Sequence, residues 1–308
     1  MKPTMARMLI GVALANKDAV LLRRAAELAR VADTRLVTLL HVLPSFYQMM
    51  TESFRRELAD STRERLNDLA AQWRSKFPSN VELRPVVHFG NPGLVILQTA
   101  LSEIPDLICL GRASKDKSHL GEEARTVARQ APCSVLLVAG DDSGKWGRIW
   151  VPLDFSDRSF DALEVSAMFA AAHQNARVTV QHVYGVPVGY HQLGRTFDEF
   201  ANEQKLIALA EWQKLEKEHS IDAAQFQLRL DLDPTPMVFD SHHYPIVEAG
   251  IQEGKPDLVV LSSRGRGAVT AFLLGSMAAR LVEKTDRTIL VLRRPGDNLG
   301  LLEALFLP

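Results

Sequence analysis

The segment Pro105–Leu110 reads PDLICL, and it returns as Pro256–Leu261, which reads PDLVVL. The two segments lie 151 residues apart (256 − 105) in a chain of 308 residues, which is long enough for two domains. After its aspartate each segment is continuously apolar, a pattern typical of a strand buried on both faces of a parallel sheet. The pair therefore predicts two copies of one α/β fold.

Three further pairs of strand-like segments follow one another in the same order in both halves. They are Leu9–Ala13 with Trp150–Asp154, Arg35–Val42 (RLVTLLHV) with Arg177–Val183 (RVTVQHV), and Ser134–Val138 with Thr288–Leu292. The offset is 141 residues for the first two pairs (154 − 13 and 182 − 41) and 154 for the last (288 − 134). Two insertions in the second half, of ten and then three residues, explain all four offsets, so the repeat is real.

Each copy reads as strands alternating with helices, β-α-β-α-β-α-β-α-β. In the first copy, amphipathic helices are expected over Thr51–Phe77 and Pro92–Ser102, with a strand Val81–Phe89 between them. Right-handed crossovers place helices on both faces of such a sheet. We therefore expect two Rossmann-like domains, each a five-stranded parallel sheet in the order 3-2-1-4-5.

The two copies are joined by a polar stretch. Residues 140–147 read GDDSGKWG and combine three glycines with charged residues, a composition typical of a linker. We predict a first domain over residues 1–141, a linker over 142–147 and a second domain over 148–308.

The composition is that of an ordinary globular protein, with 46% hydrophobic and 24% charged residues and a net charge of −1. Nothing in this balance suggests a nucleic acid or a membrane surface as a partner. No apolar run approaches the length of a membrane span, so a cytoplasmic protein is expected. Cys109 and Cys133 each lie in or beside an apolar run, which predicts two free buried thiols.

A ligand of an open parallel sheet binds beyond the carboxyl ends of its strands, where the strand order reverses. In the second copy, Asp154 ends the first strand, and Ser262-Ser263-Arg264-Gly265-Arg266-Gly267 follows the fourth. Gly275-Ser276 then opens a helix over Met277–Lys284. The unpaired N–H groups of that helix start favour an anion, and Arg264 and Arg266 can neutralise phosphate.

Each of these residues also has an ordinary structural explanation. Gly265 and Gly267 could form a simple turn, Ser276 could cap its own helix, and Asp154 could cap the helix that begins near Arg158. Together, at the point where the strand order reverses, they favour a ligand that carries phosphate.

These residues resemble those of the tandem universal stress proteins, over nearly the whole chain. The resemblance rests on Pro152–Ser156, on His182-Val183, and on Gly265, nine residues, then Gly275-Ser276. The family's ATP-binding pattern is a glycine, two residues, a glycine, nine residues, and Gly-Ser or Gly-Thr. Ser262 stands in place of the first glycine. Its Cβ hinders the close approach of a ligand to the backbone, so we expect weaker binding there.

The resemblance implies a fold like that of the adenine nucleotide alpha hydrolases and a role for each matching residue. Asp154 would contact adenine, Val183 would offer backbone contacts to the base, and the glycine loop would hold ribose and phosphates. The implied nucleotide-binding residues are Asp154, Val183, Leu261, Ser262, Arg264, Gly265, Gly275, Ser276 and Met277. It also implies that the final strands, Ser134–Ala139 and Thr288–Arg293, face each other across a pseudo-two-fold axis.

The first copy departs from this pattern. Ala13 stands at the aspartate position, only six residues separate Ser114 from Gly121, and Glu122 stands where the second copy has Ser276. A carboxylate at a helix N-terminus fills the place of an anion and repels phosphate. We therefore expect no ATP binding by the first domain.

The expected function is that of a stress-response protein whose second domain binds ATP, or the related AMP or ADP, as a regulatory or sensing ligand, with Mg²⁺ as a companion ion. A regulatory protein partner and a homodimer or higher oligomer stay open. No nucleophile elbow, Walker sequence or water-orienting base marks a dedicated enzyme. The alternatives are a scaffold that binds no nucleotide and a slow or metal-dependent hydrolase.

A metal site is an alternative interpretation of the histidines. His182, His191, His242 and His243 are all expected near the carboxyl edge of the second sheet. Adjacent residues of an extended segment point in opposite directions, so His242 and His243 should not chelate one ion together. Solvated loop histidines are the expectation, and no metal ligand is assigned.

Overall fold

The computed structural model describes residues 5–112, 120–140, 146–173, 176–219, 225–237, 243–265, 274–294 and 296–306. The chain forms two compact units. The N-terminal unit holds the described residues up to 140 together with those from Val282 onward, and the C-terminal unit holds residues 146–265 and 275–281. The segment predicted as a linker overlaps residues 141–145, which lie outside the described part, so its bounds stay a prediction.

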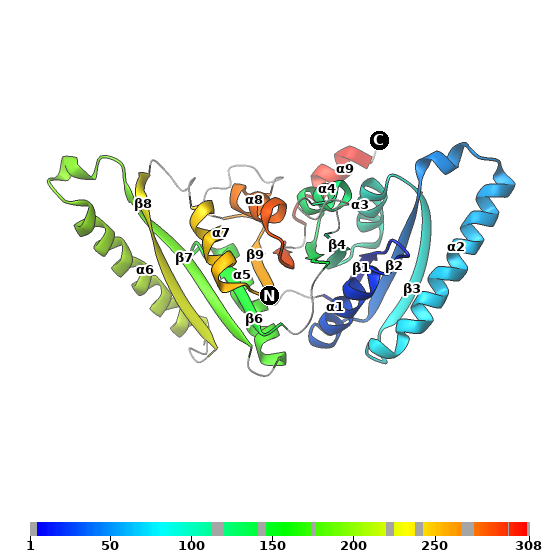
Figure 1. Cartoon of the computed structure of the whole chain (residues 1–308), viewed down its shortest axis with the longest axis horizontal. Coiled ribbons are helices and arrows are strands. Elements are labelled where there is room, and N and C mark those ends of the chain that lie inside the picture. The colour runs from blue at the N-terminus through cyan, green and yellow to red at the C-terminus, as the bar shows by residue number, and fades with distance from the viewer. Residues whose placement is uncertain are drawn as a thin grey trace. The chain divides into compact units, whose positions relative to one another are not determined.

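Five parallel strands form the sheet of the N-terminal unit: β1 (Arg7–Gly11), β2 (Leu36–Pro44), β3 (Glu82–Gly90), β4 (Leu107–Gly111) and β5 (Ser134–Val138). They lie in the order β3-β2-β1-β4-β5, which confirms the predicted order (Figure 1). A sixth strand, β10 (Ile289–Leu292), pairs antiparallel with β5. The last strands of the two copies are therefore neighbours, as the resemblance implied.

Helices cover this sheet on both faces (Figure 1). They are α1 (Asp18–Val31), α2 (Glu52–Trp73), α3 (Pro92–Glu103), α4 (Glu122–Gln130) and α9 (Leu299–Phe306), with short 3-10 turns η1 (Ser45–Met49) and η2 (Arg74–Lys76). Helix α2 packs on β2 and β3, whereas α3 contacts α4 and α9. Because every crossover between parallel strands is right-handed, α1 and α2 share one face and α3 and α4 share the other.

The C-terminal unit repeats four of these strands. They are β6 (Arg148–Pro152), β7 (Arg177–Pro187), β8 (Phe226–Met237) and β9 (Leu258–Ser262), all parallel and in the order β9-β6-β7-β8. The helices are α5 (Asp157–Ala172), α6 (Phe197–His219), α7 (Tyr244–Gly254) and α8 (Ser276–Lys284), with a 3-10 turn η3 (Tyr190–Leu193). The order again follows 3-2-1-4, and the fifth strand of this copy is β10.

The segments that predicted the repeat are buried on both faces. All residues of β4 and β9 are buried except the last of each strand, which lies at the carboxyl edge. The aspartates that precede them, Asp106 and Asp257, each accept a hydrogen bond from the backbone N–H that begins the neighbouring first strand, at 2.9 Å from both Arg7 and Arg148. The Pro-Asp-Leu motif therefore sets the register of the central strand pair in both units.

A histidine within the second strand makes the same contact in both units. His41 Nδ1 lies 2.9 Å from the carbonyl oxygen of Val12, and His182 Nδ1 lies 2.8 Å from that of Leu153. Both members of the pair are shifted by 141 residues (182 − 41 and 153 − 12). The repeat therefore extends to side-chain hydrogen bonds that the alignment of apolar runs did not use.

The C-terminal segment of the chain closes the end of α4. The Arg293 guanidinium donates hydrogen bonds to the carbonyl oxygens of Ala128 and Arg129, and the Asn298 side-chain amide donates to that of Ala131 at 3.1 Å. These carbonyls lie at the helix C-terminus, where they lack partners within the helix and where positive charge is favoured. Residues after β10 thus complete a helix of the N-terminal unit.

Helices α3 and α7 both end on a left-handed residue that is not glycine. Ile104 has φ of 48° and Lys255 has φ of 43°, at an offset of 151 residues (255 − 104). Both side chains are exposed, so little burial opposes a change.

We predict that Ile104→Gly and Lys255→Gly each raise the free energy of unfolding by about 1 kcal/mol, because glycine adopts positive φ without the steric cost of a Cβ. Chemical denaturation with circular dichroism detection checks this. Gln98→Gly, at an exposed position inside α3, is the control and should lower the free energy by about 0.5–1 kcal/mol. Destabilisation at the two helix ends would contradict the prediction.

Both cysteines are free and buried, as the sequence predicted. Burial raises the pKa of the Cys133 thiol to about 12 and moves that of Cys109 further in the same direction. Thiolate, rather than thiol, is the reactive form.

We therefore expect neither thiol of the folded protein to react with a disulfide dye at mildly alkaline pH, and both to react after denaturation. The measurement is the release of thionitrobenzoate from Ellman's reagent. Because the folded chain holds these thiol protons more tightly than the unfolded chain does, the free energy of unfolding should fall as pH rises above the pKa of an unfolded thiol. Fast labelling of the native protein would contradict this account.

Candidate functional site

The loop after β6 turns on a left-handed residue and fixes Asp154. The N–H of Leu153 donates to the Gln181 carbonyl at 2.8 Å, which extends the β6–β7 pairing, and Phe155 then adopts φ of 55°. The Asp154 carboxylate accepts hydrogen bonds from the Ser156 N–H at 3.0 Å and its hydroxyl at 2.6 Å. Ser156, not Asp154, caps α5, so the capping alternative for Asp154 is wrong.

The loop after β9 begins with a serine that braces its own backbone. The Ser262 hydroxyl donates to the carbonyl oxygen of Arg264 at 2.7 Å, within a tight turn. Next to it, the Ser263 carbonyl accepts the N–H of Gly275 at 2.8 Å, which joins the two ends of the loop. The predicted residues Arg266 and Gly267 lie outside the described part of the chain.

Two glycines allow these loops to meet. A Cβ added to Gly265 would lie 2.3 Å from the Asp154 Oδ2 atom, and one added to Gly275 would lie 3.3 Å from the carbonyl oxygen of Ser263. Any side chain at Gly265 would displace the Asp154 carboxylate. The structure therefore brings Asp154, Gly265 and Gly275 together, although they lie far apart in the sequence.

The remaining predicted residues surround this point. Ser276 is exposed and is the first residue of α8, Met277 is half-buried beside it, and Leu261 is buried at the end of β9. Val183 is buried in β7, next to His182, whose ring packs on Phe155 with centroids 4.5 Å apart. All nine residues thus belong to the carboxyl ends of the strands of one unit or to the start of α8.

A residue that the sequence analysis did not single out also belongs here. Ser263 is 2% exposed, and its hydroxyl has no hydrogen-bond partner among the described residues. An unpaired buried hydroxyl is costly, which makes it a candidate donor to a ligand. The only sequence signal was its position, one residue beyond the buried strand β9.

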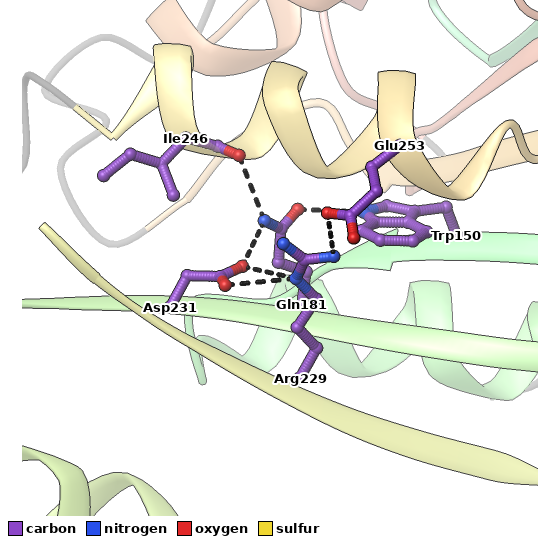
Figure 2. Close-up of polar contacts among 6 residues, drawn as sticks. All are labelled: Trp150, Gln181, Arg229, Asp231, Ile246 and Glu253. Atoms are coloured by element: carbon purple, nitrogen blue, oxygen red, sulfur yellow. Dashed lines mark hydrogen bonds and ion pairs between the residues drawn. The ribbon is translucent and has the colours of Figure 1, made fainter.

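A buried polar network joins the strands that lead to the site (Figure 2). The Trp150 indole N–H donates to the Gln181 side-chain oxygen at 2.9 Å, and the Gln181 amide donates to Asp231 at 2.7 Å and to the carbonyl of Ile246 at 3.2 Å. The backbone carbonyl of Gln181 also accepts the N–H of Leu153, the residue before Asp154. The network therefore ties β6, β7, β8 and α7 together, and Gln181 links it to the loop that contains Asp154.

Arg229 extends this network toward the solvent (Figure 2). It donates to both carboxylate oxygens of Asp231, at 3.1 and 2.8 Å, and to Glu253 at 2.8 Å. The hydrogen bond to Asp231 raises the pKa of Arg229 above its usual value. Helix α7 can lie this close because Gly250 and Gly254 face Gln181 and Trp150, where an added Cβ would lie 2.5 Å and 2.4 Å from the two side chains.

The corresponding loops of the N-terminal unit carry carboxylates at different positions. Asp18, which is 4% exposed, accepts the N–H groups of Ala13 at 3.1 Å and Ala15 at 2.9 Å. Helix α4 begins at Glu122, with Glu123 beside it in the first turn, and both are exposed. The sequence predicted that Glu122 lies at a helix start, and its effect on phosphate stays a prediction; the contacts of Asp18 were not predicted.

The three described histidines of the set considered as metal ligands make separate contacts. His182 is bonded to Leu153, His191 packs on the Tyr190 ring in η3, and His243 lies 3.4 Å from Asp233. His242 lies outside the described residues. Within the described residues, no three histidine, cysteine, aspartate or glutamate side chains are placed to share a metal ion.

No helix in the described part of the chain is long and apolar enough to span a membrane.

The Universal stress protein family model matches this chain twice, over residues 5–139 and 145–293. The chain therefore belongs to the universal stress protein family and carries two copies of its domain. Among curated proteins, no relative matches.

Solved structures show the same fold over nearly the full chain. A protein of unknown function from Pseudomonas aeruginosa PAO1 is 17% identical, with a TM-score of 0.68, over 98% of this chain and 96% of that one. A universal stress protein from Archaeoglobus fulgidus DSM 4304 is also 17% identical, with a TM-score of 0.62, over 94% of this chain and 99% of that one.

We predict that Gly265→Ala lowers the free energy of unfolding by about 1–3 kcal/mol, because the new methyl group displaces an Asp154 carboxylate held by two hydrogen bonds. The matched control is Gly111→Ala, at the end of β4, where an added Cβ meets nothing within 4 Å. It should change the free energy little. Denaturant titration of both variants is the measurement, and equal stabilities would show that Asp154 and Gly265 are not in contact.

Proposed function

We propose that the second domain, residues 148–308 after a linker over 142–147, binds ATP or the related ADP or AMP as a regulatory ligand. The first domain, residues 1–141, binds no nucleotide in this proposal. The observation that carries it is the meeting of Asp154, Gly265 and Gly275 beside the exposed start of α8. Because the loops after β6 and β9 meet here, backbone N–H groups and the Asp154 carboxylate lie together at one edge of the sheet.

The phosphates are assigned to the start of α8. Its first N–H groups have no partners within the helix, the helix dipole favours negative charge there, and Ser276 adds a hydroxyl. The buried hydroxyl of Ser263 is a further donor in the adjacent loop. Mg²⁺ would enter as the companion of the phosphates, because no cluster of ligating side chains among the described residues requires a resident ion.

The base is assigned to the ends of β6 and β7. A carboxylate such as Asp154 accepts hydrogen bonds from an exocyclic amine or a ribose hydroxyl. Val183 adds a buried apolar residue within β7, next to His182. In this proposal the protein acts in the cytoplasm, as a single chain or as an oligomer. Nucleotide binding changes which protein partner it binds.

One observation favours a second candidate, a scaffold that binds no nucleotide. The Ser262 hydroxyl already bonds the Arg264 carbonyl, so the loop is braced without a ligand. Two results would support the scaffold. The purified chain would carry no adenylate, and its melting temperature would not change with ATP and Mg²⁺. Steady turnover of ATP that is lost in Asp154→Ala would instead support a slow hydrolase.

We predict that Ser276→Glu weakens ATP binding by about tenfold or more, because a carboxylate at the first position of α8 repels phosphate and occupies the helix start. It copies Glu122 of the first domain. Isothermal titration calorimetry should give one nucleotide per chain in the natural protein. Ser276→Gln, of the same size without the charge, is the matched control and should keep the affinity within about threefold.

Two outcomes would overturn the proposal. Equal ATP affinities for Ser276→Glu and Ser276→Gln would show that the phosphates are not bound at the start of α8. Two nucleotides per chain would show that the first domain binds one as well.

A further inference from the structure

The N-terminal unit contains a cavity of about 380 Å³ at the carboxyl ends of β1, β2 and β4. This volume lies within the range of sites for small molecules, and such sites form where the strand order reverses. The proposed function leaves this cavity without a role.

The walls of the cavity are mainly apolar. They are formed by residues that include Val12, Leu21, Leu40, Ile96, Leu110 and Val138. Gly111 also lines it, and a Cβ added there would meet no atom within 4 Å. Gly111 is the exposed last residue of β4, so a larger side chain at this edge of the cavity would displace no atom near its Cβ.

Two carboxylates of the lining compete with an anion or repel it. The Asp18 carboxylate lines the cavity and takes the N–H groups of Ala13 and Ala15, which follow β1. Glu123 lines it from the first turn of α4, so the helix start carries negative charge of its own. A bound anion would meet two carboxylates and none of these amides.

The two cations of the lining do not compensate for this. Lys17 is exposed to solvent, where its charge is hydrated and screened. Arg112 is half-buried and directs one guanidinium N–H to the carbonyl oxygen of Val282 at 3.0 Å. Together, the two cations and the two carboxylates give the lining no net charge.

We propose that the N-terminal domain binds an uncharged, apolar small molecule in this cavity, and not a nucleotide. The apolar walls favour a ligand that gains by leaving water, and a preformed cavity costs little ordering on binding. The proposal is independent of nucleotide binding by the second domain.

The test uses the full chain and two probes with the same ring, indole and indole-3-acetate. Binding is followed by NMR shifts of the methyl groups of Val12, Ile96 and Val138, which report on the cavity itself. Indole should shift these signals and saturate them, whereas indole-3-acetate should bind about tenfold more weakly or not at all, because its carboxylate would be buried without a partner. ATP should not displace indole.

Two variants at one position localise the binding. Gly111→Leu places a bulky side chain at the edge of the cavity and should weaken indole binding by about tenfold or more, whereas Gly111→Ala adds one methyl group and should change it by less than about threefold. The comparison of the two probes needs no variant, so it stands if Gly111→Leu does not fold. Equal binding of both probes, no shift with indole, or unchanged affinity in a folded Gly111→Leu would each overturn the proposal.

Discussion

Both units depend on one hydrogen bond, between a histidine within the second strand and the backbone that follows the first. His41 bonds the carbonyl of Val12, and His182 bonds that of Leu153. Two residues later the chain adopts a left-handed conformation, at Leu14 and at Phe155, with φ of 55° in each case. The bond holds this costly turn in place, and the turn sets where the next residues can direct their side chains.

The two units place a carboxylate at different points of this shared frame. In the C-terminal unit Asp154 lies in the turn itself, against the backbone of Gly265, and α8 begins with a neutral serine. In the N-terminal unit Asp18 lies in the following helix and reaches back to the turn. The same backbone therefore holds a carboxylate against the glycine loop in one copy, whereas in the other copy a carboxylate accepts the amides of the turn.

The repeat, the strand order and the positions of the glycines could be predicted because they follow from apolar periodicity and from spacing. The network around Gln181 could not, because a single glutamine in an apolar run carries no signal of its partners on β8 and α7. Ser262 was judged only as a missing glycine, whereas its hydroxyl braces the loop. The role of Asp18 depends on a turn whose left-handed residue is leucine, where the sequence offers no glycine to mark it.

The antiparallel pairing of β10 with β5, together with the Arg293 contacts to α4, means that the last part of the chain completes the N-terminal unit. The middle of the polypeptide is thus inserted between two portions of one folded body. During synthesis the N-terminal half leaves the ribosome with β5 as an open sheet edge, and it stays unfinished until the residues from Val282 onward arrive. A chain cut after its first half would expose that edge to other molecules.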